Sequence, residues 1–303
     1  MTEKPLEGRI AVVAGATRGA GRGIARMLGE AGATVYCSGR STRNNPSPIG
    51  RPETIEETAD MVDQEGGQGI AVRTDHTDPE QVQALFERVD KEQDGRLDIL
   101  VNDIGGEDLA EWNPLQEADL DRGFAFIQTA VHTHIISTRH ALPLLLAQGH
   151  GLIVEITDGD HTGYRGALFY DLAKTQIMRL AFGLATELRR TDIAVVAVTP
   201  GFLRSEAMLD NFGVTEANWQ DAADKAKGFS ESETPCFVGR AVAALAADAN
   251  VKAKSGRTLA SWTLAKEYGF HDIDGRRPDW MGFVLQSLDE LLASGGAPAA
   301  EER

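Results

Sequence analysis

The chain has 303 residues, of which 42% are hydrophobic and 25% charged, and its formal net charge at pH 7 is −16. This length and apolar content suffice for one large α/β domain or two small ones, and they argue against a disordered or fibrous protein. A chain this acidic lacks the excess of Lys and Arg that binds a phosphate backbone. The charge therefore argues against nucleic acid and anionic membranes as partners.

The N-terminal sequence and the cysteines indicate a reducing compartment. MTEKPLEGR carries charges where a signal sequence needs an apolar core, and no apolar run approaches the roughly 20 residues that span a bilayer. Cys37 and Cys236 show neither CxxC nor Cys/His spacing, so neither a disulfide framework nor a zinc site is supported. We therefore expect a soluble, cytoplasmic protein without a membrane partner.

Short apolar runs rich in β-branched residues alternate along the chain with longer helical patterns. Runs that are apolar at nearly every position are typical of strands buried on both faces. The expected strands are 9–15, 33–39, 69–75, 97–103, 151–157, 193–200 and 256–262. Their alternation with helices predicts an α/β fold, a single domain with a doubly wound, mostly parallel Rossmann sheet of about seven strands and helices on both faces.

The strongest chemical signal is the stretch VVAGATRGAGRGIARML near the start of the chain. It combines a buried strand, a turn with Gly15, Gly19 and Gly21, and an Ala/Leu/Met helix. Glycine permits positive φ and close approach, so the helix can direct its free N–H groups and positive dipole end at a pyrophosphate. Because the turn follows the first strand of a parallel sheet, we predict a dinucleotide site rather than a packing turn.

The end of the second expected strand indicates which dinucleotide binds. An NAD site usually has an acidic residue there for the ribose hydroxyls, whereas this sequence has SGRSTR, with Arg40 and Arg43, and has Arg18 inside the glycine turn. Unless these cations are solvated loop residues, they favour a 2′-phosphate and hence NADP(H). The insertion STRNNPSPIGRPETIEETAD reads as a proline-broken loop leading into a helix, and we expect it to fold over the adenosine phosphate.

Two polar residues, Asp75 and His76, end the third expected strand. Asp75 is placed to accept a hydrogen bond from the adenine amino group, with His76 beside it. The alternative is that Asp75 caps a turn at the strand end.

Two longer helices and one irregular segment are expected in the second half of the chain. Apolar residues at three- and four-residue spacing predict a helix from about 119 to 145 and another after Tyr170. Residues 206–235 mix Met, Leu, Phe and Trp with acidic positions, which predicts a mobile substrate lid. We assign residues 1–275 to a dinucleotide-binding and catalytic domain that carries this lid, and 276–303 to a C-terminal helix and loose tail.

Tyr170 and Lys174 lie four residues apart at the start of the helix after the fifth expected strand, on one helix face. A tyrosine with a reference pKa of roughly 10 is a poor acid or base at neutral pH unless a neighbouring cation favours its phenolate. In reduction, a hydride reaches a carbonyl carbon while the phenol gives its proton to the developing alkoxide. The position of the pair in a dinucleotide fold favours catalysis over simple surface amphipathicity.

Four motifs carry a resemblance to a known family. AGATRGAG, NDIGG, YDLAK and TPGFLRSE occur in the order and context of the short-chain dehydrogenase/reductase superfamily, over residues 8 to about 265. GRLDILVN, ATELRR and LAKEYGFHDIDGR are similar to the group around dehydrogenase/reductase family member 1, whose members are NADP(H)-linked carbonyl reductases. The resemblance implies an oxidoreductase that forms homodimers or homotetramers through its long helices.

The resemblance also implies roles for particular residues. Asn102 and Gly105 would support the cofactor and the central sheet, while Pro200, Gly201 and Ser205 would border the nicotinamide. It makes Tyr170 the general acid and Lys174 its electrostatic partner and ribose ligand.

The sequence departs from the family at two catalytic positions. Alignment on IVEITD puts Asp158 where the family has a serine, whereas counting thirteen residues back from Tyr170 gives Thr157. An ionised Asp158 would repel both the phenolate and the developing alkoxide, and a protonated one would donate a hydrogen bond. Where the family often has an asparagine that holds a relay water, the sequence has Ala130, with Gln128 and Thr133 nearby.

Two groups of candidate metal ligands are interpreted as structural. Asp158, Asp160 and His161 form a polar loop of the kind that is usually solvated. His132 and His134 do not share a helix face, so the histidines of the long helix, His140 included, read as packed or surface residues. We predict no metal site.

Together these features predict an NADP(H)-dependent short-chain oxidoreductase that acts on a small carbonyl compound or secondary alcohol, with Tyr170, Lys174 and Asp158 at the reaction centre. The alternative from another class is a catalytically weakened NADP(H)-binding sensor or assembly protein, because of Asp158 and Ala130. A third reading is a reductase of an activated alkene.

Overall fold

The computed structural model describes residues 4–160 and 163–293. Its centre is a seven-stranded parallel sheet in the order β3-β2-β1-β4-β5-β6-β7. The strands are β1 Ile10–Ala14, β2 Thr34–Gly39, β3 Gln68–Arg73, β4 Ile99–Asn102, β5 His150–Ile156, β6 Asp192–Thr199 and β7 Thr258–Ala260. The predicted parallel Rossmann sheet is confirmed, and each strand lies within a residue or two of the expected run.

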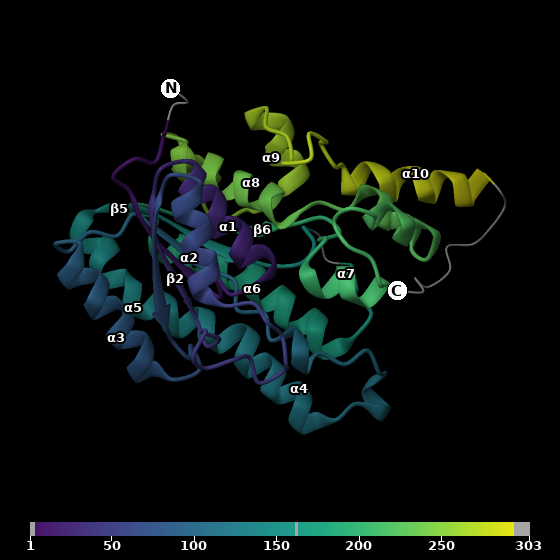
Figure 1. The fold of residues 1–303 in the computed structure, drawn as a ribbon, viewed down its shortest axis with the longest axis horizontal. Coiled ribbons are helices and arrows are strands. Elements are labelled where there is room, and N and C mark those ends of the chain that lie inside the picture. Colours follow the sequence, from purple (N-terminus) through teal and green to yellow (C-terminus); the bar gives the residue numbers. More distant parts are fainter. Residues whose placement is uncertain (1–3, 161–162, 294–303) are drawn as a thin grey trace.

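Helices cover both faces of the sheet, with the termini of the described chain on its periphery (Figure 1). One face packs against α1 Gly19–Glu30, α2 Ile55–Gln64, α8 Pro235–Ala247 and α9 Ser261–Tyr268. The other face packs against α3 Pro79–Glu92, α5 Thr133–Gln148 and α6 Leu168–Glu187. Both faces of strands such as IAVVA in β1 are therefore buried, which explains their continuous apolar sequence.

The long helix expected from about 119 to 145 is present but not uniform. It consists of α4 Leu120–Ile127, a π-helical stretch Gln128–His132 and α5 Thr133–Gln148, and it ends at Gly149 with φ of 82°. A π-helical turn adds a residue to the helical repeat, so the faces of α4 and α5 are out of register. The irregular stretch includes Ala130, one of the two positions where the sequence departs from the family.

The segment expected to form a lid contains α7 Glu206–Phe212 and two short 3₁₀ turns, Trp219–Asp224 and Lys227–Glu231. It is built around a cluster of aromatic rings, in which Phe202 packs edge-to-face on Phe229 at 5.2 Å. The C-terminal helix α10, Trp280–Ala293, joins this cluster because the Trp280 ring lies 5.6 Å from that of Phe202.

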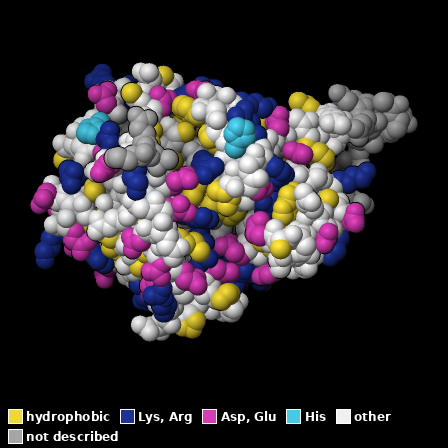
Figure 2. All heavy atoms as spheres, turned by 45° about the horizontal axis from the view of Figure 1, so that its top comes forward, with side chains coloured by type: hydrophobic (Ala, Val, Ile, Leu, Met, Phe, Trp, Pro, Cys, Tyr) yellow, Lys and Arg dark blue, Asp and Glu magenta, His cyan; other side chains and the backbone are white. Residues whose placement is uncertain are grey.

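The buried guanidinium of Arg204 fixes the lid segment from inside. It lies 4.1 Å from the Trp219 ring and pairs with Glu216 and Asp274 at 3.0 Å each. Within the described residues, no helix is long and apolar enough to cross a membrane. Acidic and basic side chains are interspersed over the face of the molecule in Figure 2.

Candidate active site

The candidate site lies at the carboxyl ends of β1, β4, β5 and β6, where the sheet order changes direction between β1 and β4. Gly15 follows β1 with φ of 94°, and a Cβ on it would lie 2.3 Å from the Asp103 backbone oxygen. A Cβ on Gly21 would lie 2.3 Å from the Gly15 oxygen. Only glycine therefore allows this close approach of turn, strand and helix, as predicted for a turn that cradles a phosphate.

The N-terminus of α1 already holds an anionic group. Glu206, the first residue of α7, accepts a hydrogen bond from the Gly19 N–H at 2.8 Å and lies 3.7 Å from the Arg22 guanidinium. Ser205 caps α7 by accepting from the Met208 N–H, and its Cβ lies 3.9 Å from the place of a Cβ on Gly19. A carboxylate at this point demonstrates that the helix end accepts negative charge. No local sequence signal identifies Glu206, because 187 positions separate it from Gly19.

The insertion after β2 does fold back beside the glycine turn. Arg18 donates to the Ser47 hydroxyl at 3.2 Å and lies 3.3 Å from the buried Glu53 carboxylate. Arg51, which the sequence reasoning missed, donates to the same carboxylate and pairs with Asp210 of α7 at 2.9 Å. Burial raises the pKa of Glu53, but the hydrogen bonds from Arg51 and the backbone, together with the charges of Arg51 and Arg18, outweigh it and hold the pKa below its usual range.

Arg40 and Arg43 have different surroundings at the end of β2. Arg43 is exposed and pairs with Asp60 of α2. The Arg40 side chain is exposed and has no hydrogen bond or ion pair among the described residues, although its charge acts on Asp75. Arg40 is thus a cation at the strand end without a protein anion bound to it.

Asp75 and His76 have different surroundings at the end of β3. Asp75 accepts from both the N–H and the hydroxyl of Thr77, which is the turn-capping arrangement; burial raises its pKa, but these bonds lower it overall. The expectation that His76 lies beside the cofactor needs correction. His76 lies in the core, with its ring nitrogens 2.9 Å from the hydroxyls of Ser38 and Ser137. Burial lowers its pKa to about 3, so it is a neutral structural residue and not a cofactor ligand.

Asn102 ends β4 and belongs to a buried polar network. Its amide donates to Thr138 at 3.0 Å and to Glu155 at 3.1 Å, while its side-chain oxygen is buried and has no hydrogen-bond partner among the described residues. His134 lies 2.7 Å from the other oxygen of Glu155, so this histidine is packed in the core. Gly105 lies in the loop directly after β4. This network supports the sheet and leaves one acceptor oxygen unused below the glycine turn.

Tyr170, Lys174 and Asp158 come together at the end of β5. The Tyr170 hydroxyl donates to Asp158 Oδ2 at 2.9 Å, and the Lys174 ammonium lies 5.3 Å from the centre of the Tyr170 ring. Thr157 instead donates its hydroxyl to the Lys174 backbone oxygen at 2.8 Å. Of the two residues proposed for the serine position, Asp158 is therefore the one that faces the phenol.

Arg165 holds the loop that carries Asp158, and the sequence reasoning missed it. This buried side chain donates to the Asp158 backbone oxygen at 2.5 Å and pairs with Asp171, in the first turn of α6, at 2.9 Å. Since Tyr170 is the neighbour of Asp171, the bond fixes the loop relative to the phenol. The predicted cluster with Asp160 includes His161, which lies outside the described residues.

The loop after β6 is fixed by a buried carboxyl. Glu233 Oε2 accepts from the Gly201 N–H at 2.9 Å and from the Ser261 hydroxyl at 2.6 Å, while Oε1 is buried and has no partner in the part of the chain that the structure describes. Burial raises the pKa of Glu233 to about 8, with these hydrogen bonds opposing the shift. Pro200, between Thr199 and Gly201, accepts from the Thr199 hydroxyl at 2.8 Å.

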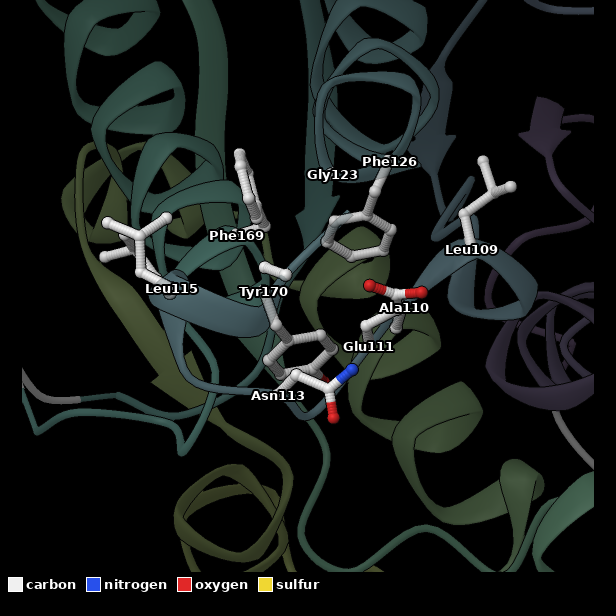
Figure 3. Close-up of a pocket in the computed structure, with 11 residues that line it drawn as sticks. Leu109, Ala110, Glu111, Asn113, Leu115, Gly123, Phe126, Phe169 and Tyr170 are labelled. Carbon is white, nitrogen blue, oxygen red and sulfur yellow. The ribbon is translucent and has the colours of Figure 1, made fainter. Parts of the chain in front are cut away.

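A pocket opens beside the phenol, formed by the α4 region and the start of α6 (Figure 3). The Tyr170 ring lies 5.0 Å from the ring of Trp112 and 5.9 Å from that of Phe126. Glu111 lines the same pocket and lies 3.4 Å from the Arg122 guanidinium. A group that enters this pocket would meet aromatic faces, the Tyr170 phenol and the Glu111 carboxylate.

Comparison with known proteins agrees with this arrangement. The sequence model of the short chain dehydrogenase family matches residues 9–213. Human dehydrogenase/reductase SDR family member 1 is 34% identical over 284 residues, which cover 90% of this chain and 85% of that protein. The chain belongs to the short-chain dehydrogenase/reductase family.

Other relatives of this short-chain dehydrogenase/reductase extend the comparison. The 7alpha-hydroxysteroid dehydrogenase of Clostridium sardiniense is 31% identical over 69% of this chain and 76% of its own length. A crystal structure of a short chain dehydrogenase from Mycobacterium thermoresistibile superposes with a TM-score of 0.75 at 22% identity, covering 91% of this chain and 92% of that one. At this identity the structural likeness establishes the fold alone.

Proteins of the short-chain dehydrogenase/reductase family act on small molecules with a nicotinamide cofactor, NAD or NADP. The residues present fit such a cofactor. The turn at Gly15 and Gly21 is a cradle that a Cβ would fill, and the Gly19 N–H holds a carboxylate where a pyrophosphate would bind. Asn102 adds a buried acceptor oxygen without a partner near the same turn.

Two side chains of this short-chain dehydrogenase/reductase differ from the catalytic residues that the resemblance implies. Asp158 lies on the phenol where the resemblance implies a serine. Ala130 packs in an apolar cluster with Phe126 and α6, and neither neighbour replaces an asparagine there, because Gln128 is exposed and Thr133 donates to the Thr129 backbone oxygen.

Proposed function

We propose that this protein is an NADP(H)-dependent oxidoreductase that interconverts a carbonyl compound and a secondary alcohol, with Tyr170 as general acid and base. The observation that carries the proposal is the phenol of Tyr170 beside the Lys174 ammonium, at the strand ends that also hold the glycine turn. The Lys174 ammonium lies 5.3 Å from the ring centre, and a cation beside a phenol is the arrangement that proton transfer by tyrosine requires.

The nicotinamide cofactor supplies or receives the hydride when it is bound. Tyr170 gives its proton to the developing alkoxide in reduction and removes it in oxidation. Thr157 holds the backbone of α6 at Lys174, and Glu233 holds the N–H of Gly201, so the two loops that border the reaction centre are fixed before substrate arrives. A hydroxyl hydrogen rotates freely, so Tyr170 can turn its proton from Asp158 to a substrate oxygen.

The preference for the phosphorylated cofactor rests on Arg18 and Arg40. Both are at the strand end where a 2′-phosphate would bind, and Arg40 has no anionic partner in the described part of the chain. Each charge-assisted hydrogen bond is worth roughly 1.5 to 3 kcal/mol, so NADPH should bind about tenfold or more tightly than NADH. Titration calorimetry with both cofactors tests this, and Arg40→Asp should remove the preference. Equal affinities in the parent protein would refute it.

The catalytic assignment is tested by following NADPH oxidation with a panel of ketones and aldehydes. Tyr170→Phe should abolish turnover while leaving NADPH binding within a few-fold of the parent. Tyr268→Phe is the matched control, because the Tyr268 hydroxyl contacts Asp248 away from the site. Cofactor binding without turnover of any compound would instead favour a sensor or assembly role, for which the bond between Tyr170 and Asp158 is the specific support.

We also propose that the protein associates through its long helices. Large apolar side chains are exposed on α4, α5 and α6, with Phe124 60%, Ile135 47% and Phe182 47% accessible. Apolar surface of this kind is usually covered in the assembled protein. Light scattering at micromolar concentration should give a dimer or tetramer, and a monomer would contradict the proposal.

A further inference from the structure

The carboxylate of Asp158 is the most informative departure from the expected site. It contacts the reacting phenol at 2.9 Å, and its second oxygen has no hydrogen-bond partner within residues 4–160 and 163–293. No cation in that part of the chain pairs with it. The guanidinium of Arg165 bonds to the backbone oxygen of Asp158 and pairs with the Asp171 carboxylate.

A carboxylate in this place is unfavourable for a neutral ketone. As hydride reaches the carbonyl carbon, negative charge develops on the oxygen that the phenol contacts, and Asp158 repels that charge at close range. The repulsion disappears if the substrate brings its own positive charge next to the reacting carbon. A protonated amine on the adjacent carbon would bond to the Asp158 carboxylate while the carbonyl oxygen bonds to Tyr170.

The spacing of the two groups matches such a substrate. The Tyr170 oxygen and Asp158 Oδ2 are 2.9 Å apart, and the nitrogen and oxygen of a vicinal amino alcohol also lie roughly a hydrogen-bond distance apart when gauche. Two further features near the phenol favour a cation. The Trp112 ring, 57% exposed, offers an aromatic face 5.0 Å from the Tyr170 ring, and Glu111 lines the pocket on which Tyr170 also borders.

We propose that the substrate of this site is a 1,2-amino alcohol or the corresponding α-amino ketone, with its ammonium group bound by Asp158. This inference rests on the proposed carbonyl and alcohol chemistry and names the substrate class. In oxidation, the C–H bond breaks, its hydrogen leaves as hydride to the oxidised nicotinamide cofactor, and the hydroxyl proton passes to Tyr170. The carbinol becomes a ketone, the cofactor is reduced, and the ammonium group keeps its charge.

The experiment compares two compounds of the same shape, 2-amino-1-phenylethanol and 1-phenylpropan-1-ol, in which an ammonium replaces a methyl group. With NADP⁺ at pH 7, kcat/KM for the amino alcohol should exceed that for the neutral alcohol about 10- to 100-fold, as expected for one charge-assisted hydrogen bond. Asp158→Asn should remove this ratio, and Asp158→Ser should reverse it by accepting the neutral alcohol better. Glu111→Gln, which removes the carboxylate of the neighbouring pocket, should lower this ratio less than Asp158→Asn does.

Binding provides a second readout that does not require turnover. Calorimetry with 2-amino-1-phenylethanol should give a dissociation constant at least tenfold lower for the parent than for Asp158→Asn. Equal kcat/KM for both alcohols, or a preference lost in Glu111→Gln and kept in Asp158→Asn, would overturn the inference and leave the proposed function intact. Absence of any NADP⁺ reduction, with the amine bound by Asp158, would instead overturn the proposed function.

Discussion

The position of Glu206 at the N-terminus of α1 predicts that this residue stabilises the protein without cofactor and weakens cofactor binding. Its carboxylate accepts the Gly19 N–H at 2.8 Å, where a pyrophosphate is expected. We therefore expect the cofactor to displace Glu206 and to move the start of α7. Glu206→Gln removes the competing charge. The variant should bind NADPH more tightly than the parent and should be less stable in the absence of cofactor.

The magnitude follows from the surroundings of the carboxylate. A hydrogen bond from N–H to a carboxylate is worth roughly 1.5 to 3 kcal/mol when shielded. The Glu206 side chain is 28% exposed and its distance to Arg22 is 3.7 Å, so solvent screening reduces the effect to about 1 to 2 kcal/mol. That is a 5- to 30-fold decrease in the dissociation constant for NADPH and a decrease of similar free energy in apo stability.

Calorimetry with NADPH and urea unfolding of the apo protein measure the two effects. Asp221→Asn is the matched control, because it also removes one negative charge from the lid segment. Among the described residues, the Asp221 side chain bonds only to the Asn218 side chain. The control should change neither quantity beyond a few tenths of a kcal/mol. Tighter binding by the control, or weaker NADPH binding by Glu206→Gln, would refute the view that Glu206 competes with the cofactor.

Three further changes test the framework of the site. Because burial raises the pKa of Glu233 from 4.5 to about 8, the folded protein holds a proton that the unfolded chain releases, and stability is lost as pH rises between these values. Glu233→Gln should remove this pH dependence, which amounts to at most about 1.4 kcal/mol of unfolding free energy per pH unit and is measured by urea unfolding. If the unfolding free energies of the parent and the variant change with pH in the same way, the prediction is wrong. Gly21→Ala places a Cβ 2.3 Å from the Gly15 oxygen and should weaken NADPH binding at least tenfold by calorimetry. A lysine in Arg165→Lys cannot bond at once to the Asp158 backbone oxygen and the Asp171 carboxylate, so we expect kcat to fall at least tenfold with little loss of NADPH affinity.

The parts of the site that the sequence predicted are those encoded within one element. The glycine turn needs a strand, spaced glycines and a helix within about twenty positions, and the Tyr170 and Lys174 pair needs only the helical repeat. Strands were also predicted closely, because a parallel sheet buried on both faces requires continuous apolar runs. Local physics determines each of these features, so one sequence suffices to find them.

The parts that were missed depend on residues far apart in the chain. His76 follows Asp75 at a strand end, and nothing local indicates that Ser38 and Ser137 bind both its ring nitrogens. Arg51 and Glu206 come to the glycine turn from loops whose path depends on packing. The choice between Thr157 and Asp158 depended on one loop residue, and it is the anchoring of the Thr157 hydroxyl to α6 that turns Asp158 toward the phenol.

Two carboxylates accept hydrogen bonds from groups that the proposed reaction needs. Glu206 accepts a hydrogen bond from the N–H expected to bind the pyrophosphate, and Asp158 accepts one from the phenol proposed as the general acid. An anionic cofactor frees the first group by competition for the same N–H. A neutral substrate gives Asp158 no alternative bond, whereas a cationic one binds it and leaves Tyr170 to the reacting oxygen. We therefore expect the site to select opposite charges at its two ends, an expectation that follows from the positions of the two side chains rather than from the family to which the protein belongs.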